Sequence, residues 1–414
     1  MKAHGEITPP GDKSISHRAF LFGALANGTT RIKGVLESRD VMSTAKAVQS
    51  LGIEARKDHE DWVVKGGTLR EPITVIDAGN SGTTARLLSG ICAGIDGVTI
   101  LTGDSSLVCR PMGRVITPLE KMGARFLARS GRYLPMAIQG GSLQGISYDM
   151  EIASAQVKSA LLLAGLSASG TTTITEPSKS RDHTERMLAY FGAEVAVDGT
   201  TIYMSPGQRL QAREITVPSD PSSAAFPAVW AAATPGSSLL IRGVCINPTR
   251  TGFLRVLERM GAHITVENIR EWAGEPVGDI QVDGGVLHAT TIEGEEIPTL
   301  IDEIPTLVAA ACLAQGRTEI RDASELRVKE TDRIAAMVQG LTSLGAHVDE
   351  NDDGMTIEGP VQLHSGSVRT FSDHRIAMCL HILAKAFDID VHLDDPSCVD
   401  ISYPDFFSSM ETLV

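Results

Sequence analysis

The chain has 414 residues, of which 42% are hydrophobic and 21% charged, a composition typical of globular proteins. Because one hydrophobic core seldom serves more than about 250–300 residues, this length favours two domains. The formal net charge of −14 argues against a general nucleic-acid or anionic-membrane surface, so any anionic ligand needs a local concentration of lysine and arginine.

The first notable segment is Gly11–Arg18, GDKSISHR, which precedes a run of small apolar residues, Ala19–Ala26, that predicts a buried helix. The polar residues then lie at the helix N-terminus, where unpaired N–H groups and the helix dipole favour an anion. An ordinary N-cap formed by Ser14 or Ser16 is the alternative. A P-loop is excluded, because Asp12 separates the glycine from the lysine and the earlier glycine is missing.

A short pattern recurs along the chain at the ends of amphipathic segments. Its copies are LGIEA, MGARF, FGAEV, MGAHI and LGAHV, which begin at residues 51, 122, 191, 260 and 344. Each copy predicts a helix that ends at a C′ glycine and is followed by a strand. Six further segments combine a polar cluster, a small-residue helix and a β-rich strand. We therefore expect six α/β repeats, three in each domain.

The domain boundaries follow from the ends of the chain. The last repeat stops at a helix, and the N-terminal segment MKAHGEI offers the strand that would complete it. We therefore expect a lower domain of residues 1–11 and 218–414 and an upper domain of residues 12–217. A solenoid is the structural alternative, but each repeat is long for one and the polar helix starts differ from copy to copy.

The polar residues at the expected helix starts are more than caps require. A cap needs one serine, threonine, aspartate or asparagine, and it does not need Lys13, Arg18 or Lys158. If the helix N-termini of a domain converge, their positive ends form a face that attracts anions. Asp302 and Glu330 are the carboxylates in the second half's charged cluster that are placed for acid–base work.

Nine motifs, in order along the whole chain, resemble the 5-enolpyruvylshikimate-3-phosphate (EPSP) synthase family, the 3-phosphoshikimate 1-carboxyvinyltransferases. They are GDKSISHR, GNSGTTAR, RPMGR, SAQVKSALLLAGL, RDHTERML, DEIPTLVAAA, ELRVKETDRI, SDHRIAM and YPDFF. SAQVK and RDHTE resemble the subgroup often called class II. The resemblance implies an α/β fold in which two domains form an inside-out α/β barrel, each domain with three βαβαββ repeats.

The resemblance also implies the reaction. The enolpyruvyl group of phosphoenolpyruvate is transferred to the 5-hydroxyl of shikimate 3-phosphate, and phosphate is released, in the shikimate pathway of aromatic amino-acid biosynthesis. No metal and no organic cofactor is implied. Both substrates are polyanions, which arginines and helix N-termini bind well. Addition followed by elimination needs two carboxylates with separate roles and a cation at the leaving phosphate.

Individual roles follow from the same resemblance. Asp302 is the implied base near the 5-hydroxyl, Glu330 acts on the methyl group of phosphoenolpyruvate, and Lys13 contacts both substrates and is a candidate acid. The residues implied to bind phosphoenolpyruvate are Lys13, Asn80, Gly82, Thr83, Arg110, Gln156, Arg333 and Arg375. Those implied to bind shikimate 3-phosphate are Lys13, Ser14, Arg18, Ser154, Ala155, Gln156, Arg181, Asp302 and Lys329. Which carboxylate moves which proton stays open.

Simpler roles remain open for some of these residues. Glu330 is also suited to a surface ion pair with Arg333, three positions later, and Arg86 to bracing its own helix. Three histidines suit orienting or capping roles better than catalysis: His17, His183 and His374. Val108 and Ile401 stand where some relatives carry a basic residue, so the phosphoenolpyruvate pocket is expected to have one cation fewer.

The resemblance further implies inhibition by glyphosate, a phosphoenolpyruvate-like anion. Gly82 leaves room that an alanine methyl group would fill, whereas the class II motifs are typical of tolerant relatives. We expect measurable inhibition that is competitive with phosphoenolpyruvate.

Two other functions are considered. A UDP-N-acetylglucosamine enolpyruvyl transferase carries a reactive cysteine several residues before its loop arginine, whereas here Cys109 immediately precedes Arg110. A non-catalytic repeat scaffold would not need Asp302 and Glu330 together with a cationic set. Six scattered cysteines without a CxxC pair, and the lack of a signal-peptide pattern or long apolar run, indicate a cytoplasmic protein. We expect a monomer that binds neither nucleic acid nor a membrane.

Overall fold

The computed structural model describes residues 1–414 and divides into two compact units. The first unit comprises Gly11–Val217 and Trp272–Glu275, and the second comprises Met1–Pro10, Pro218–Glu271 and Pro276–Val414. Gly11 and Trp272–Glu275 thus join the first unit, although both fall within the range expected for the lower domain. No helix combines the length and apolar character needed to cross a membrane.

The first unit contains three separate four-stranded sheets. One has the order β15 (Glu214–Thr216), β2 (Gly28–Lys33), β4 (Asp61–Gly66), β3 (Glu54–Asp58). Another has the order β5 (Ile76–Asp77), β6 (Gly97–Thr102), β8 (Tyr133–Gly140), β7 (Arg125–Arg129). The third has the order β10 (Ser147–Asp149), β12 (Thr172–Thr175), β14 (Thr201–Met204), β13 (Val195–Asp198). A small sheet pairs β9 (Leu143–Gln144) with β11 (Ala168–Ser169).

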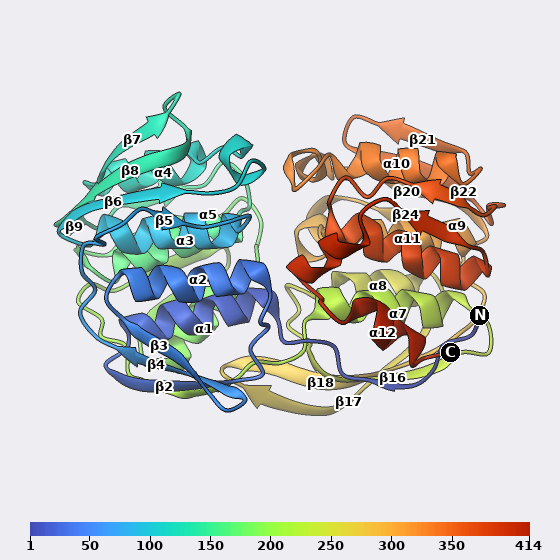
Figure 1. Ribbon diagram of the computed structural model, residues 1–414, viewed down its shortest axis with the longest axis horizontal. Coiled ribbons are helices and arrows are strands. Elements are labelled where there is room, and N and C mark those ends of the chain that lie inside the picture. Colours follow the sequence, from blue (N-terminus) through green and yellow to red (C-terminus); the bar gives the residue numbers. More distant parts are fainter. The chain divides into compact units, whose positions relative to one another are not determined.

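Helices α1, α2, α3 and α5 of the first unit lie between two of the sheets, with β2–β4 on one side and β6–β8 on the other (Figure 1). The helix bounds in this unit are α1 (Lys13–Leu25), α2 (Arg39–Ser50), α3 (Gly82–Ala93), α4 (Gly113–Lys121), α5 (Ala155–Gly165) and α6 (His183–Tyr190), and the short 3-10 helix η1 spans Leu107–Cys109. Buried residues, most of them apolar, cover almost the whole circumference of α1, α3 and α5. Gly90 lets α3 approach α5 closely, since a Cβ there would lie 2.0 Å from the Ala160 carbonyl oxygen.

The second unit contains two four-stranded sheets and one two-stranded sheet. The first has the order β1 (His4–Ile7), β16 (Ser238–Cys245), β18 (Glu275–Asp283), β17 (His263–Trp272). The second has the order β19 (Thr291–Ile292), β20 (Gly316–Ile320), β22 (Gly354–Gly359), β21 (Val348–Asn351), and the pair is β23 (Gly366–Val368) with β24 (Val391–Leu393). The sheets of both units are separate and do not close.

The helices of the second unit repeat the arrangement of the first. They are α7 (Pro221–Ala233), α8 (Gly252–Arg259), α9 (Ile304–Leu313), α10 (Arg333–Ser343), α11 (His374–Phe387) and α12 (Phe406–Glu411), with 3-10 helices η2 (Gly294–Thr299), η3 (Ser324–Val328) and η4 (Pro396–Ile401). The apolar helices α7, α9 and α11 pack against one another and form the core of the unit, to which α7 contributes Phe226 and Trp230. The expected mixed α/β class is therefore confirmed.

Short parallel edge strands carry the chain from one unit to the other. β1 pairs with β16 in the second unit but leads into α1 of the first, and β15 pairs with β2 in the first unit but leads into α7 of the second. On its other edge, β1 contacts the C-terminus, because His4 N–H donates to the Leu413 carbonyl oxygen at 2.8 Å. The N-terminal strand and the C-terminal helix thus belong to the same unit.

Candidate active site

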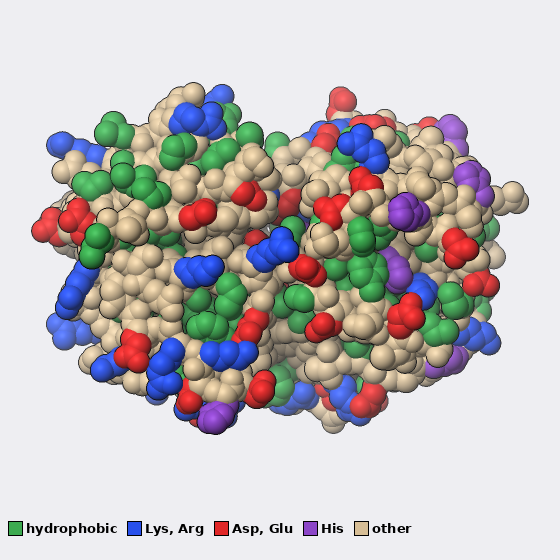
Figure 2. Space-filling view, viewed as in Figure 1, with side chains coloured by type: hydrophobic (Ala, Val, Ile, Leu, Met, Phe, Trp, Pro, Cys, Tyr) green, Lys and Arg blue, Asp and Glu red, His purple; other side chains and the backbone are tan.

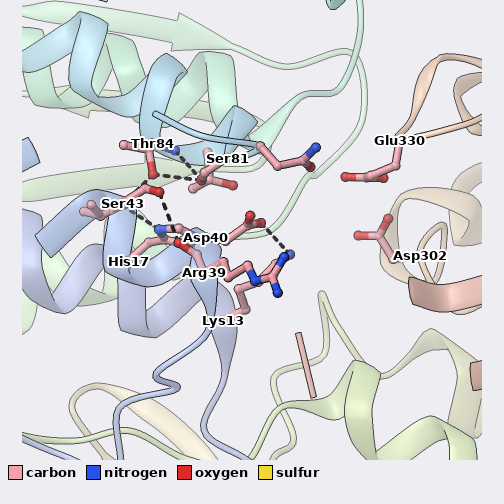
Figure 3. Close-up of polar contacts among 12 residues, drawn as sticks. Lys13, His17, Arg39, Asp40, Ser43, Ser81, Thr84, Asp302 and Glu330 are labelled. Carbon is pink, nitrogen blue, oxygen red and sulfur yellow. Dashed lines mark hydrogen bonds and ion pairs between the residues drawn. The ribbon is translucent and has the colours of Figure 1, made fainter. Parts of the chain in front are cut away.

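The N-terminus of α1 is capped by Asp12, whose carboxylate accepts from the Ile15 N–H at 2.7 Å. The expected caps, Ser14 and Ser16, do not fill this position. The Lys13 ammonium pairs with Asp40, at the N-terminus of α2, with an Nζ–Oδ2 distance of 2.9 Å (Figure 3). Lys13 is thereby held at the place where two helix N-termini meet.

A buried line of polar groups joins α1, α2 and α3. His17 Nδ1 lies 2.7 Å from Thr44 Oγ1, which lies 2.6 Å from Thr84 Oγ1. Thr84 in turn donates to Ser81, the N-cap of α3 (Figure 3). Burial, with smaller contributions from Lys13 and Arg18, lowers the pKa of His17 well below its ordinary value. His17 is therefore neutral and fixes helix positions, in line with an orienting role.

Gly82 is the first residue of α3. Four other residues implied to bind phosphoenolpyruvate lie in the same part of the unit: Asn80, Thr83, Arg110 and Gln156. Gln156 at the start of α5 donates to Thr83 at 3.0 Å and accepts from Arg86 at 2.9 Å. Arg110 donates to Asn80 at 3.1 Å. Arg86 thus links α3 to Gln156 of α5, and it also donates to the Pro111 carbonyl oxygen.

The remaining polar groups of the first unit gather where α1, α5 and α6 begin. Arg18 donates to Thr184 and Ser159, each at 2.8 Å, and to the Ser14 carbonyl oxygen at 3.0 Å. Burial lowers the pKa of Arg18 to about 10, against the opposing effect of nearby carboxylates, so Arg18 stays charged at neutral pH. Ser154 caps α5, Ala155 is its first residue, and Arg181 lies partly buried just before α6.

Lys158, a cation that the sequence places near the start of α5, does not join this group. Lys158 is fully buried, with its Nζ atom 2.8 Å from Glu176 and 2.7 Å from Glu185. The sequence counts Lys158 among the cations at helix starts, but its side chain lies inside the unit, away from the other residues at the N-terminus of α5. The side chain points into the unit because it lies one turn beyond the cap, on a helix that is buried nearly all round.

In the second unit, both candidate catalytic carboxylates contact one arginine. Arg333, the first residue of α10, donates to Asp302 at 3.2 Å and to Glu330 at 2.6 Å. Lys329 lies 3.2 Å from the same oxygen of Asp302, and Arg375 donates to the Asp302 carbonyl oxygen at 3.0 Å. The carboxylates of Asp302 and Glu330 point to the same side (Figure 3).

The pair between Glu330 and Arg333 is formed, but it is no surface pair. Arg333 is only 1% exposed and also contacts Asp373, the N-cap of α11, at 2.8 Å. Burial opposes the charge of Arg333, but Asp373, Glu330 and Asp302 outweigh it and raise the pKa above its ordinary value. Arg333 is thus a fixed cation on which three carboxylates converge.

A second buried arginine was not among the predicted site residues. Arg250, just before α8, donates to Asp220 and Ser222 at the start of α7, each at 3.0 Å. Ser222 also donates to Glu303, the residue next to Asp302. These contacts link the N-termini of α7, α8 and α9. The available signal was an arginine shortly before the amphipathic segment that ends at Met260, and it indicates a charge at a helix start without revealing this linkage.

The structure therefore brings the predicted residues together in two groups, each at converging helix N-termini within one unit. Elsewhere on the visible face, acidic and basic side chains are mixed, with no broad area of one charge (Figure 2). The Arg129 guanidinium donates to the Val108 carbonyl oxygen. Each group combines cations with carboxylates, which suits polyanionic substrates and proton transfer.

The family model for EPSP synthase (3-phosphoshikimate 1-carboxyvinyltransferase) matches residues 1–410. The chain belongs to the EPSP synthase family. Its relatives include the 3-phosphoshikimate 1-carboxyvinyltransferase of Thermodesulfovibrio yellowstonii, 50% identical over 99% of this chain and 97% of the relative. That of an Anaeromyxobacter species is 51% identical over 99% of this chain and 96% of the relative.

Solved structures agree with this membership. EPSP synthase from Acinetobacter baumannii superposes with a TM-score of 0.89 at 40% identity, covering 100% of this chain and 96% of that one. The enolpyruvyl transferase NikO from Streptomyces tendae has a TM-score of 0.81 at 18% identity, covering 100% and 95%, which shows a shared fold alone. Family membership makes the chain an enzyme and favours EPSP synthase activity over the UDP-N-acetylglucosamine transferase and the non-catalytic scaffold.

Proposed function

We propose that the chain transfers the enolpyruvyl group of phosphoenolpyruvate to the 5-hydroxyl of shikimate 3-phosphate and releases phosphate. The observation that carries this proposal is the contact of one buried guanidinium, Arg333, with both Asp302 and Glu330. Family membership supplies the identity of the substrates, and the two cationic groups at helix N-termini supply a chemical reason to bind polyanions.

Phosphoenolpyruvate is the substrate proposed for the cations and small residues around Gly82 and for the arginines of the second unit. Arg110 suits a bidentate contact with a phosphate or carboxylate, because its guanidinium is already oriented by Asn80 and Ser106. Lys13 is proposed to contact both substrates, with Asp40 holding its ammonium group. The complete proposed set is Lys13, Asn80, Gly82, Thr83, Arg110, Gln156, Arg333 and Arg375.

Shikimate 3-phosphate is proposed to bind where α1, α5 and α6 begin, together with Asp302 and Lys329. The N-terminus of α5, capped by Ser154, offers backbone N–H groups to a phosphate. Arg18 and Arg181 add the positive charge. The complete proposed set is Lys13, Ser14, Arg18, Ser154, Ala155, Gln156, Arg181, Asp302 and Lys329.

Two carboxylates and one ammonium are proposed to move the protons. In the addition, Asp302 takes the proton of the 5-hydroxyl, whose oxygen bonds to C2 of phosphoenolpyruvate, while an acid protonates the methylene carbon. In the elimination, a base removes a proton from the new methyl group, the double bond forms again and phosphate leaves. Glu330 is proposed to act at the methyl carbon, and Lys13 is the alternative acid. The neighbouring cations stabilise the charge that develops on the phosphate.

The finer description of the fold is part of the proposal. We propose that each unit consists of three βαβαββ repeats of an inside-out α/β barrel. This proposal is supported by the family resemblance and by the placement of helices between sheets in the first unit. We also propose a cytoplasmic monomer without metal or organic cofactor. The six cysteines are all free, and only Cys109 is exposed, which fits a reducing compartment.

Phosphate release tests the proposed substrates. The enzyme is mixed with phosphoenolpyruvate and either shikimate 3-phosphate or UDP-N-acetylglucosamine, and inorganic phosphate is measured over time. We expect release that depends on shikimate 3-phosphate. Release with the nucleotide sugar alone would favour the other transferase, and release with neither would contradict the proposal.

A further inference from the structure

We propose that Lys158 is a positioning residue for shikimate 3-phosphate: it fixes the segment Glu176–Asp182, which carries Arg181, against the N-terminus of α5. This inference rests on the proposed binding roles of Arg181 and of Ser154–Gln156. Lys158 itself is fully buried and contacts no substrate in the proposed site, so it would act through the residues that it holds.

Three contacts attach this segment and the first turn of α6 to one ammonium group. Lys158 Nζ lies 2.8 Å from Glu176 Oε2, 2.7 Å from Glu185 Oε1 and 3.5 Å from the Ser180 carbonyl oxygen. The side chains of Lys158, Glu176 and Glu185 are 0%, 1% and 7% exposed. The ammonium is thus bound within the protein rather than by water.

The three attached groups come from successive parts of the chain. Glu176 directly follows β12, Ser180 lies in the irregular segment, and Glu185 lies in the first turn of α6. The Ser180 hydroxyl also donates to Glu176, which closes the segment on itself. Arg181 follows Ser180 directly, so the backbone at Arg181 is held from both sides.

Lys158 connects this segment to the proposed binding residues of α5. Its own N–H donates to the Ser154 carbonyl oxygen at 3.0 Å, one helical turn earlier. The next residue, Ser159, makes a parallel connection, with its hydroxyl 2.6 Å from Thr184 Oγ1 and 2.8 Å from Arg18 Nη2. Two adjacent residues of α5 therefore set the distance between its N-terminus and the start of α6.

Stability alone does not explain a buried ammonium with two carboxylates. Burying ions costs desolvation free energy, and well-packed apolar residues of similar volume often serve as well or better for stability. Ion pairs differ from apolar contacts in fixing direction and distance. Here they order a segment that has no regular secondary structure and precedes a proposed binding arginine.

The test uses a variant without orphaned charges, Lys158→Met combined with Glu176→Gln and Glu185→Gln. We expect it to fold, to raise KM for shikimate 3-phosphate by roughly tenfold or more, and to leave kcat and KM for phosphoenolpyruvate nearly unchanged. A milder variant, Ser180→Ala, removes only the hydroxyl contact with Glu176 and is expected to raise the same KM by a smaller factor.

Two comparisons separate positioning from stability and from the site assignment. Leu162→Ala, at a buried position of the same helix, is expected to lower Tm without changing either KM. Arg181→Ala is expected to raise KM for shikimate 3-phosphate. The same substitution added to the triple variant is expected to raise this KM by a smaller factor, because the two effects share one cause. An unchanged KM in the triple variant and in Ser180→Ala, with a raised KM in Arg181→Ala, would overturn the positioning role alone. An unchanged KM in Arg181→Ala would overturn the site assignment and the inference with it.

Discussion

Arg333 Nη1 lies 3.2 Å from Asp302 Oδ1, although 31 positions separate the two residues in the chain. The same guanidinium donates to Glu330 at 2.6 Å. The two carboxylates proposed to move protons therefore share one buried cation, and its planar, forked donors set the distance between them.

The first prediction concerns Arg333→Lys. An ammonium keeps the charge but lacks the fork, so it cannot hold Asp302, Glu330 and Asp373 at the present distances. We expect kcat to fall on the order of 10²-fold, with Tm lowered because the carboxylates around residue 333 lose buried partners. Steady-state kinetics and thermal unfolding check this, and turnover close to that of the unmodified enzyme would show that the fork is not needed.

The second prediction concerns Gly82→Ala. A Cβ at this position would lie 2.6 Å from Arg86 Nη1 and 3.5 Å from Arg110 Nη1. The Arg86 guanidinium would have to move, which disturbs its contact with Gln156. We expect glyphosate to compete with phosphoenolpyruvate in the unmodified enzyme, and the alanine to weaken glyphosate by about 1–3 kcal/mol.

The measurement compares the inhibition constant of glyphosate with KM for phosphoenolpyruvate in both enzymes. Glyphosate should lose more affinity than phosphoenolpyruvate does. Equal losses would mean that the added methyl group does not discriminate between them. An unmodified enzyme that tolerates glyphosate would show that another part of the pocket decides sensitivity.

The third prediction concerns stability at acid pH. His381 packs against the rings of Phe406 and Phe407, and burial, with a smaller effect of Lys385, lowers its pKa to about 4. The unfolded chain has a histidine pKa near 6.5, so between these values the unfolded state binds more protons. Stability should therefore fall as the pH drops from about 6.5 to about 4.

His381→Phe removes the titrating group while keeping a ring in the same apolar surroundings. Between pH 7 and pH 5 the variant should lose about 2 kcal/mol less unfolding free energy than the unmodified enzyme does. Urea unfolding at both pH values measures this difference. Parallel losses in the two proteins would assign the acid sensitivity to other groups, among them the buried His17, whose pKa is lowered as well.

The sequence predicted the α/β class and the polar helix starts because both follow from local patterns. Small apolar residues without a polar stripe predict buried helices such as α5, and glycines at C′ mark helix ends. Lys13, Gln156 and Arg333 were placed at helix starts correctly for the same reason. The resemblance to a family then added roles that no local pattern contains.

Other features depend on tertiary contacts and were not predictable in this way. Lys158 looks like a helix-start cation in the sequence, and only the fold places Glu176 and Glu185 around it. Asp12 rather than Ser14 is the cap because the helix begins at Lys13, two residues earlier than a cap at Ser14 requires. The pairing of β15 with β2 also depends on long-range contacts rather than on strand propensity, whereas the placement of the N-terminal strand β1 in the second unit agrees with the expected domain boundaries.

The central claim is that Asp302 and Glu330 perform proton transfer in this enzyme, and their isosteric variants test it most directly. Asp302→Asn and Glu330→Gln keep the volume of each side chain and remove its ability to exchange a proton at neutral pH. The deciding measurement is kcat for phosphate release, with binding of shikimate 3-phosphate measured by calorimetry as the control. We predict that each variant folds and binds shikimate 3-phosphate but loses about 10²–10⁴-fold in kcat. Turnover within a few-fold of the unmodified enzyme in either variant would remove that residue from the mechanism.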